Sequence, residues 1–199
     1  MRYEFKRAIV VSMYALVWPF GLASNVNYRW FGSEAAFGFS AKLLSLVPGK
    51  TGQYLRAAFY KMTLTECHYD LMVGFCSYFA HPTARAGRRV GTGSFTIIGT
   101  ADIGDGVLIG SRVSILSGKH QHGSFLNGVT PSAEGHFEPV AIGGGSWIGD
   151  GAIVMASLGE HCMVSAGSVV TKPAPDRVVA VGNPARFLKT AEGARDATT

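Results

Sequence analysis

A six-residue repeat most constrains the fold of this chain of 199 residues. In most of the C-terminal half, an aliphatic residue recurs every six positions and is usually followed by a small residue. Helical solenoid repeats need about 30 residues or more, so a period of six excludes them. The rhythm shortens by two residues between 154 and 164. The residues that carry the period are Ile103, Ile109, Ile115, Ile142, Ile148, Val154, Val164 and Val170.

This period predicts a mainly β fold, a parallel β-helix in which each six-residue unit is one short strand and a turn. Three units close one triangular coil, and each repeating aliphatic side chain points inward and stacks on its equivalent in the next coil. The 26 glycines suit the tight corners of such a fold. We expect the β-helix over residues 71–189, an apolar helical region over 1–70 and a tail over 190–199.

The rhythm stops between residues 121 and 139, where the sequence is QHGSFLNGVTPSAEGHFEP. This stretch is polar, rich in glycine and too long for a corner of the prism. Long excursions from compact domains are usually functional or disordered. We therefore predict one long loop expelled from the β-helix.

The N-terminal region combines basic and apolar residues. Three basic residues precede an apolar run over 8–23, which Pro19 and Gly21 interrupt and which is shorter than the roughly 20 residues that span a bilayer. Two alternatives remain: a helix on a membrane surface with its basic residues near lipid phosphates, or a helix packed on the protein or a neighbouring subunit. The stretch 33–62 is expected to be helical, with a break at Pro48 and Gly49.

Composition excludes several classes of protein. Hydrophobic residues make up 47% of the chain and charged residues 16%, which excludes a disordered chain. The net charge of +5 is spread out, without the basic runs and interleaved aromatics of a nucleic-acid-binding protein. Cys67, Cys76 and Cys162 lack the spacing of a zinc site or a disulfide framework, so we expect free thiols and a cytoplasmic location.

Two longer motifs carry a resemblance to a known family. The phrase GGGSWIGDGAIV and the ending SAGSVVTKPAPDRVVAVGNPARFL resemble those of the left-handed β-helix acetyltransferases, relatives of maltose, serine and xenobiotic acetyltransferases. The leader LLSLVPGKTGQYLRAAFYKMTL is similar to that of members from exopolysaccharide and lipopolysaccharide pathways. The resemblance implies a left-handed β-helix, a homotrimer with sites between subunits, and acetyl transfer from acetyl-CoA to a sugar hydroxyl without a metal.

The resemblance also implies a catalytic histidine just before the expelled loop. Position favours His120, which closes the unit ILSGKH, and His122 is the alternative if the coil ends differently. A histidine there takes the proton of the attacking hydroxyl and passes it to the departing thiolate. Glu134 and His136 lie in the same loop and are assigned to the acceptor, with solvated loop residues as the alternative.

The coenzyme residues are carried over from the same family motifs. Trp147 flanks the site, with its ring expected on the outer surface of the prism. Small-residue corners reach the pantetheine arm, basic residues bind the adenosine phosphates, and a proline lies near the adenine. These residues are Ala156, Ser165, Ala166, Gly167, Lys172, Pro184 and Arg186.

The sequence departs from the maltose-type enzymes in two places. The stretch VGTGSF, residues 90–95, lacks the asparagine with which those enzymes touch the acceptor, and the N-terminal region is more apolar. Both differences favour a glycan acceptor, lipid-linked and reached by peripheral contact with the inner face of a membrane. Two alternatives are a nonenzymatic β-helix scaffold and a γ-class carbonic anhydrase, whose zinc would need His81, His120 or His122, and His161 at spacings that do not match.

Overall fold

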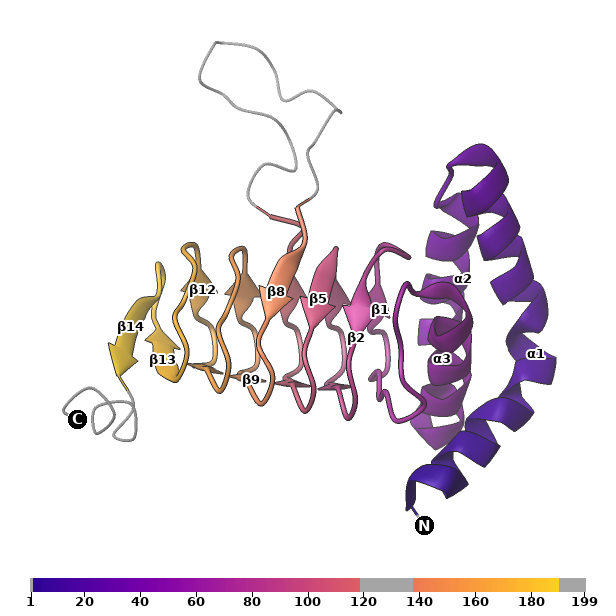
Figure 1. Cartoon of the computed structure of the whole chain (residues 1–199), viewed down its shortest axis with the longest axis horizontal. Helices are drawn as coiled ribbons and strands as arrows, with labels where there is room; N and C mark the ends of the chain where they lie inside the picture. The colour runs from indigo at the N-terminus through magenta and orange to yellow at the C-terminus, as the bar shows by residue number, and fades with distance from the viewer. Residues whose placement is uncertain (1, 119–137, 190–199) are drawn as a thin grey trace, which may run out of the picture.

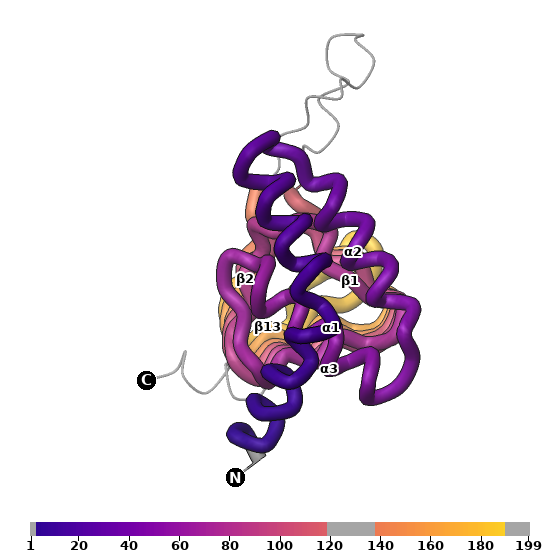
Figure 2. The backbone as a smooth tube through the Cα atoms, turned by 90° about the vertical axis from the view of Figure 1, so that its right-hand side faces the viewer, coloured from indigo at the N-terminus to yellow at the C-terminus, as the bar shows by residue number. Residues whose placement is uncertain are grey.

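A computed structural model describes residues 2–118 and 138–189. It consists of a three-sided prism of stacked coils, with three helices laid across its N-terminal end (Figure 1). Figure 2 looks onto that end and shows the helices in front of the coils. Among the described residues, the helices come first in the chain and the stacked parallel strands follow them.

Three parallel sheets form the faces of the prism. The first face contains β1 (Tyr78–Phe79), β4 (Ile97–Ile98), β7 (Ser114–Ile115), β10 (Ile153–Val154) and β12 (Val169–Val170). The second contains β2 (Arg85–Ala86), β5 (Ala101–Ile103) and β8 (Val140–Ile142). The third contains β3 (Gly91–Thr92), β6 (Leu108–Ile109), β9 (Trp147–Ile148), β11 (Met163–Val164), β13 (Val178–Val181) and the antiparallel β14 (Arg186–Lys189).

The interior of the prism is built by the predicted repeat. All eight residues that carry the period are buried, with at most 4% of their surface exposed. On the first face, for example, Ile98 pairs with Ile115, and Ile115 pairs with Val154. Each coil thus buries its aliphatic side chains on those of its neighbours, which confirms the prediction from the period.

The shortened rhythm after Val154 has a structural cause. Leu158, four residues later, bridges Ile142 and so continues the second face of the prism. Ala174 bridges Leu158 and follows Val170 at the same interval. The corner between the first and second faces is therefore tighter than the others in these last coils.

The helices α2 (Ala35–Ser45) and α3 (Gly49–Thr63) cover the N-terminal end of the prism. The break between them falls at Pro48, as predicted. Tyr60 is fully buried, its ring packs edge-on against Phe79 of β1, and its hydroxyl oxygen accepts a hydrogen bond from the Phe79 amide at 3.1 Å. Burial raises the pKa of Tyr60, so the phenol stays protonated and serves the packing.

The helix α1 (Arg2–Phe31) lies outside α2 and α3 (Figure 1). Its buried stripe contains Val10, Val17 and Ser24, and its Gly21 lies against Met62 of α3. Pro19 lies within the helix, which continues past it to Phe31. Tyr3–Phe31 is, by length and composition alone, long and apolar enough to cross a membrane, in contrast to the shorter run that the sequence suggested.

Candidate active site

The predicted catalytic and acceptor residues lie outside the described part of the chain. His120, His122, Glu134 and His136 belong to the segment 119–137, so their roles stay predictions. The residues that flank this segment lie at one corner, between the first and second faces. The amide of Glu138 donates to the carbonyl of Ser117 at 3.1 Å, just beyond β7.

Trp147 lies on the outer surface of the third face, as predicted. Its side chain is 43% exposed, although it belongs to a strand whose other residue, Ile148, is buried. In the sheet register Trp147 lies between Leu108 and Met163, which are also exposed. The three side chains form an apolar stripe, which suits contact with a ligand arm or another subunit.

Small polar residues cap the corners of the prism from one coil to the next. At the edge between the third and first faces, the Ser111 hydroxyl accepts from the Ser94 amide at 3.2 Å. The Asp150 carboxylate then accepts from the Ser111 amide at 2.7 Å. At the edge between the first and second faces, the Ser117 hydroxyl accepts from the Thr100 amide at 2.7 Å. Each corner amide is thus satisfied by a side chain of the following coil.

Alanine interrupts this series at two of the predicted coenzyme corners. Ala166 follows Asp150 by one coil and has no side-chain oxygen to accept from its amide. The register that pairs Ile115 with Val154 likewise places Ala156 one coil after Ser117. Within residues 2–118 and 138–189, the amides of Asp150 and Ser117 therefore lack the side-chain cap that the earlier corners have. Such amides suit the carbonyl groups of an extended pantetheine arm.

The remaining predicted coenzyme residues lie toward the C-terminal end of the prism. Ser165 and Gly167 flank Ala166 at its corner, and Gly167 has a positive φ of 69°. Pro184, which follows a cis peptide bond, and Arg186 at the start of β14 are exposed. Their exposure leaves them free to contact a ligand.

One subunit divides the predicted coenzyme residues between two edges. The corner at Ala166 lies between the third and first faces, and the turn before Arg186 adjoins it through the hydrogen bond from the Ala185 amide to the Val169 carbonyl, 2.8 Å long. Ala156 and the exposed Lys172 lie at the other edge of the first face. The predicted coenzyme residues of one chain therefore do not share a single corner of the prism.

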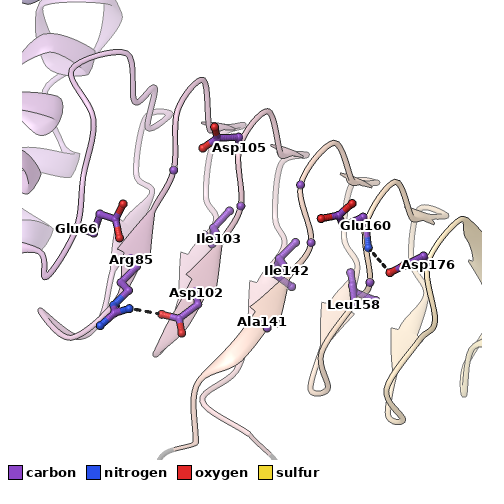
Figure 3. Close-up of a pocket in the computed structure, with 15 residues that line it drawn as sticks. Glu66, Arg85, Asp102, Ile103, Asp105, Ala141, Ile142, Leu158, Glu160 and Asp176 are labelled. Carbon is purple, nitrogen blue, oxygen red and sulfur yellow. Dashed lines mark hydrogen bonds and ion pairs between the residues drawn. The ribbon is translucent and has the colours of Figure 1, made fainter.

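A groove along the second face is unsuited to coenzyme A. It has a volume of about 490 Å³, and Figure 3 shows carboxylate side chains spread along its coils, with Arg85 beside Asp102. Arg85 lies 3.9 Å from Asp102, and the Asp176 carboxylate accepts from the Glu160 amide at 2.8 Å. The groove would repel the phosphates of coenzyme A, and none of the predicted coenzyme residues lines it.

The described cysteines and histidines offer no second chemistry. Burial raises the pKa of the Cys67 thiol to about 12, which leaves it without thiolate character at neutral pH. His81 lies 2.6 Å from the Glu34 carboxylate, and His161 lies on a separate corner, against Gly145. Within residues 2–118 and 138–189, no group of three or more histidines, cysteines or carboxylates is placed to hold a metal ion.

The sequence did not identify a basic cluster at the N-terminal end of the prism. Arg56 is buried with only 1% of its surface exposed, although arginine side chains lie mostly at protein surfaces. It lines a cavity with Lys50 at the start of α3. Only the position of the helix against the coils reveals this cluster.

Comparison with known proteins adds sequence relatives. No protein-family model matches the chain. Over 93 residues, 45% of the chain, it is 33% identical to the galactoside O-acetyltransferase of Escherichia coli (strain K12), and the match covers 44% of that enzyme. The chain thus spans less than half the length of the curated relatives it matches.

Two solved structures share the fold. A maltose O-acetyltransferase from Clostridium difficile 630 is 24% identical, with a TM-score of 0.68 over 83% of this chain and 90% of that one. A hexapeptide-repeat acetyltransferase from Vibrio cholerae O1 biovar eltor, solved with acetyl coenzyme A, is 21% identical, with a TM-score of 0.66 over 82% of this chain and 91% of that one. The chain is therefore similar in repeat sequence to the galactoside enzyme and shares its fold with the two solved acetyltransferases.

Proposed function

We propose that this protein transfers an acetyl group from acetyl-CoA to a hydroxyl of a saccharide. The observation that carries the proposal is the pair of corners where alanine leaves backbone amides uncapped, beside exposed Lys172 and Arg186. The galactoside enzyme supports the saccharide acceptor by sequence. The structure solved with acetyl coenzyme A has the same fold.

The reaction needs one base and a held donor. His120 or His122 takes the proton of the acceptor hydroxyl as its oxygen attacks the thioester carbonyl carbon. A carbon–oxygen bond forms, the carbon–sulfur bond breaks, and the proton passes from the imidazolium to the leaving thiolate. The amides at Asp150 and Ser117 orient the donor, and Lys172 and Arg186 bind its phosphates.

We further propose that the enzyme is a homotrimer. The predicted coenzyme residues lie on two edges of one prism, and neighbouring prisms would bring different edges together. The exposed stripe of Leu108, Trp147 and Met163 would then be covered at the subunit contact.

Coenzyme binding tests the proposal directly. We expect calorimetry to give micromolar binding of acetyl-CoA at about one site per subunit. Lys172→Gln and Arg186→Gln should each weaken binding by about ten- to a hundredfold, because a charge-assisted hydrogen bond contributes about 1.5–3 kcal/mol. Ala166→Ser should weaken it by a smaller factor, because the new hydroxyl caps the Asp150 amide.

The matched control for these variants is Arg88→Gln, an exposed arginine on the edge of the acidic groove. It should leave the affinity unchanged. Binding of CoA and of a longer acyl-CoA in the same series would define the acyl group. If acetyl-CoA, CoA and the longer acyl-CoA all fail to bind, the scaffold alternative is favoured. A monomeric mass by light scattering, together with full affinity for acetyl-CoA, would contradict a site shared between subunits.

We propose a glycan acceptor at the cytoplasmic face of a membrane, lipid-linked, with α1 as the contact. The outer face of α1 is apolar: Leu16 is 62% exposed, Trp18 52% and Leu22 50%. Its other face packs on α2 and α3, and this packing leaves the outer face available for the proposed membrane contact. A membrane would cover the exposed side chains without disturbing the packed ones.

Substitutions on this outer face test the membrane contact. Leu16→Asp with Leu22→Asp should reduce flotation with liposomes at least tenfold, because burying each leucine contributes about 1.5–3 kcal/mol. Both positions are exposed in the protein, so thermal stability should not fall. Leu188→Asp, an exposed leucine at the opposite end of the chain, is the matched control. Unchanged flotation of the double variant would refute the contact.

A further inference from the structure

A second cavity lies between the first turn of α3 and the corners of three successive coils. It has a volume of about 410 Å³. Its wall from α3 is basic and its wall from the prism is polar. The polar side chains that line it are Lys50, Gln53, Arg56, Thr92, Ser94 and Ser111.

The N-terminus of α3 faces this cavity without a cap. The helix begins at Gly49, and the preceding Pro48 makes no side-chain hydrogen bond to its first turn. That turn contains no acidic residue and carries Lys50 instead. The first amides of an α-helix lack intrahelical acceptors and carry a partial positive charge. An anion in the cavity would satisfy them.

The buried guanidinium of Arg56 is an independent sign of a ligand. Its Nε donates to the carbonyl of Val73 at 3.0 Å, and its Nη1 donates to the carbonyl of Val47 at 2.8 Å. Its Nη2 is buried and has no hydrogen-bond partner within the described residues. Burial lowers the pKa of Arg56, which a nearby anion would oppose. An arginine that lines a cavity with one unsatisfied nitrogen is an incomplete anion site.

The charge of the cavity is opposite to that of the groove on the second face. The lining of this cavity, within the described chain, includes Lys50 and Arg56 but no carboxylate. We infer that the cavity binds a phosphate group, held by the first-turn amides of α3, Lys50 and the Arg56 guanidinium.

The phosphate cavity and the coenzyme corner belong to one row of corners. Gly93 packs against Ser111, Gly110 against Asp150, and Gly149 against Ala166. Three coil steps of about 4.8 Å each separate Gly93 from Ala166, roughly 14 Å in all. A phosphate ester in the cavity would therefore extend along the row toward the donor. The phosphate could belong to a soluble sugar phosphate or to a lipid carrier.

Calorimetry of the full chain with inorganic phosphate at constant ionic strength tests the site. Saturating CoA is added first, so that Lys172 and Arg186 are occupied, and the titration is repeated without CoA. We expect about one phosphate per chain in both, with binding at least tenfold weaker in Lys50→Glu. The exposed Lys42 of α2 provides the control Lys42→Glu, which should bind phosphate as wild type does.

Lys50→Glu separates binding from folding. A carboxylate at the positive end of a helix is favourable, so the Tm of this variant without phosphate should equal or exceed that of wild type. No phosphate binding by wild type, or equal binding by Lys50→Glu, would overturn the inference. Failure of CoA binding alone would refute the proposed function and leave the phosphate titration intact.

The source of the phosphate is resolved with two further probes. One is a hexose 1-phosphate, and the other is phosphatidylcholine vesicles with and without phosphatidic acid. Tighter binding of the sugar phosphate that Lys50→Glu abolishes supports a soluble ester. Binding to phosphatidic acid that the same variant abolishes supports a lipid phosphate. If both the sugar phosphate and phosphatidic acid bind Lys50→Glu as tightly as wild type, the proposed phosphate site is wrong.

Discussion

Alanine in place of the catalytic histidine should lower kcat for acetyl transfer by about 10²–10⁴-fold, the range for loss of a general base. Because the sequence leaves His120 and His122 as alternatives, we expect this loss in one single variant and a much smaller effect in the other. The measurement is the rate of CoA release with a panel of saccharide acceptors. The affinity for acetyl-CoA should be unchanged in both variants, since the base acts on the acceptor hydroxyl.

His161→Ala is the control for this experiment. His161 is an exposed corner residue with a positive φ of 53°, on an edge that carries none of the predicted coenzyme residues. Its replacement should leave turnover intact. Full turnover in both His120→Ala and His122→Ala would show that the proposed mechanism is wrong, whatever the affinity for coenzyme.

The second large effect is expected at Arg56. Arg56→Leu should lower the free energy of unfolding by about 3–5 kcal/mol, because buried carbonyls left without a donor cost about 1–3 kcal/mol each. Arg56 joins the end of α2 to the first coil: its Nη1 donates to the carbonyl of Leu44 at 3.0 Å and its Nε to that of Val73. Chemical denaturation measures the loss.

The exposed Arg88 provides the matched control. Arg88→Leu should change the free energy of unfolding by less than about 0.5 kcal/mol, as is usual for surface substitutions. A loss below about 1 kcal/mol in Arg56→Leu would contradict the role assigned to the buried guanidinium. Arg56→Lys keeps the charge but has fewer donors. Its loss of unfolding free energy should therefore lie between that of Arg88→Leu and that of Arg56→Leu.

The prism was predictable because its sequence signal is local and repeated. Ile109 and Ile148 both carry the six-residue period, and they are buried and paired in adjacent coils. Trp147 lies one residue before Ile148 and is exposed. Because each coil stacks its corners on those of the next coil, the repeat leaves few alternative registers for the strands. The free thiols were also predictable, since Cys67 and Cys162 are buried and unpaired.

The N-terminal helices were less predictable because their packing partners are distant in sequence. Arg56 is an example: the backbone carbonyls that accept from its buried guanidinium include those of Leu44, Val47 and Val73, all at least nine residues away in the sequence. The apolar run over 8–23 also gave no sign of the full length of α1, which extends from Arg2 to Phe31. The phosphate cavity is lined by α3 and by three coils of the prism, which are far apart in the sequence, so no short motif could predict it.

The helices across the first coil also determine how this protein can associate. A stack of parallel strands presents, at an open end, a row of unpaired peptide groups on which further copies can add and grow into a fibre. Here α2 and α3 cover that row, and at the other end β14 runs antiparallel to β13. A further coil would need parallel strands on all three faces, so the antiparallel β14 should disfavour growth along the stack more than contact between the sides of two prisms.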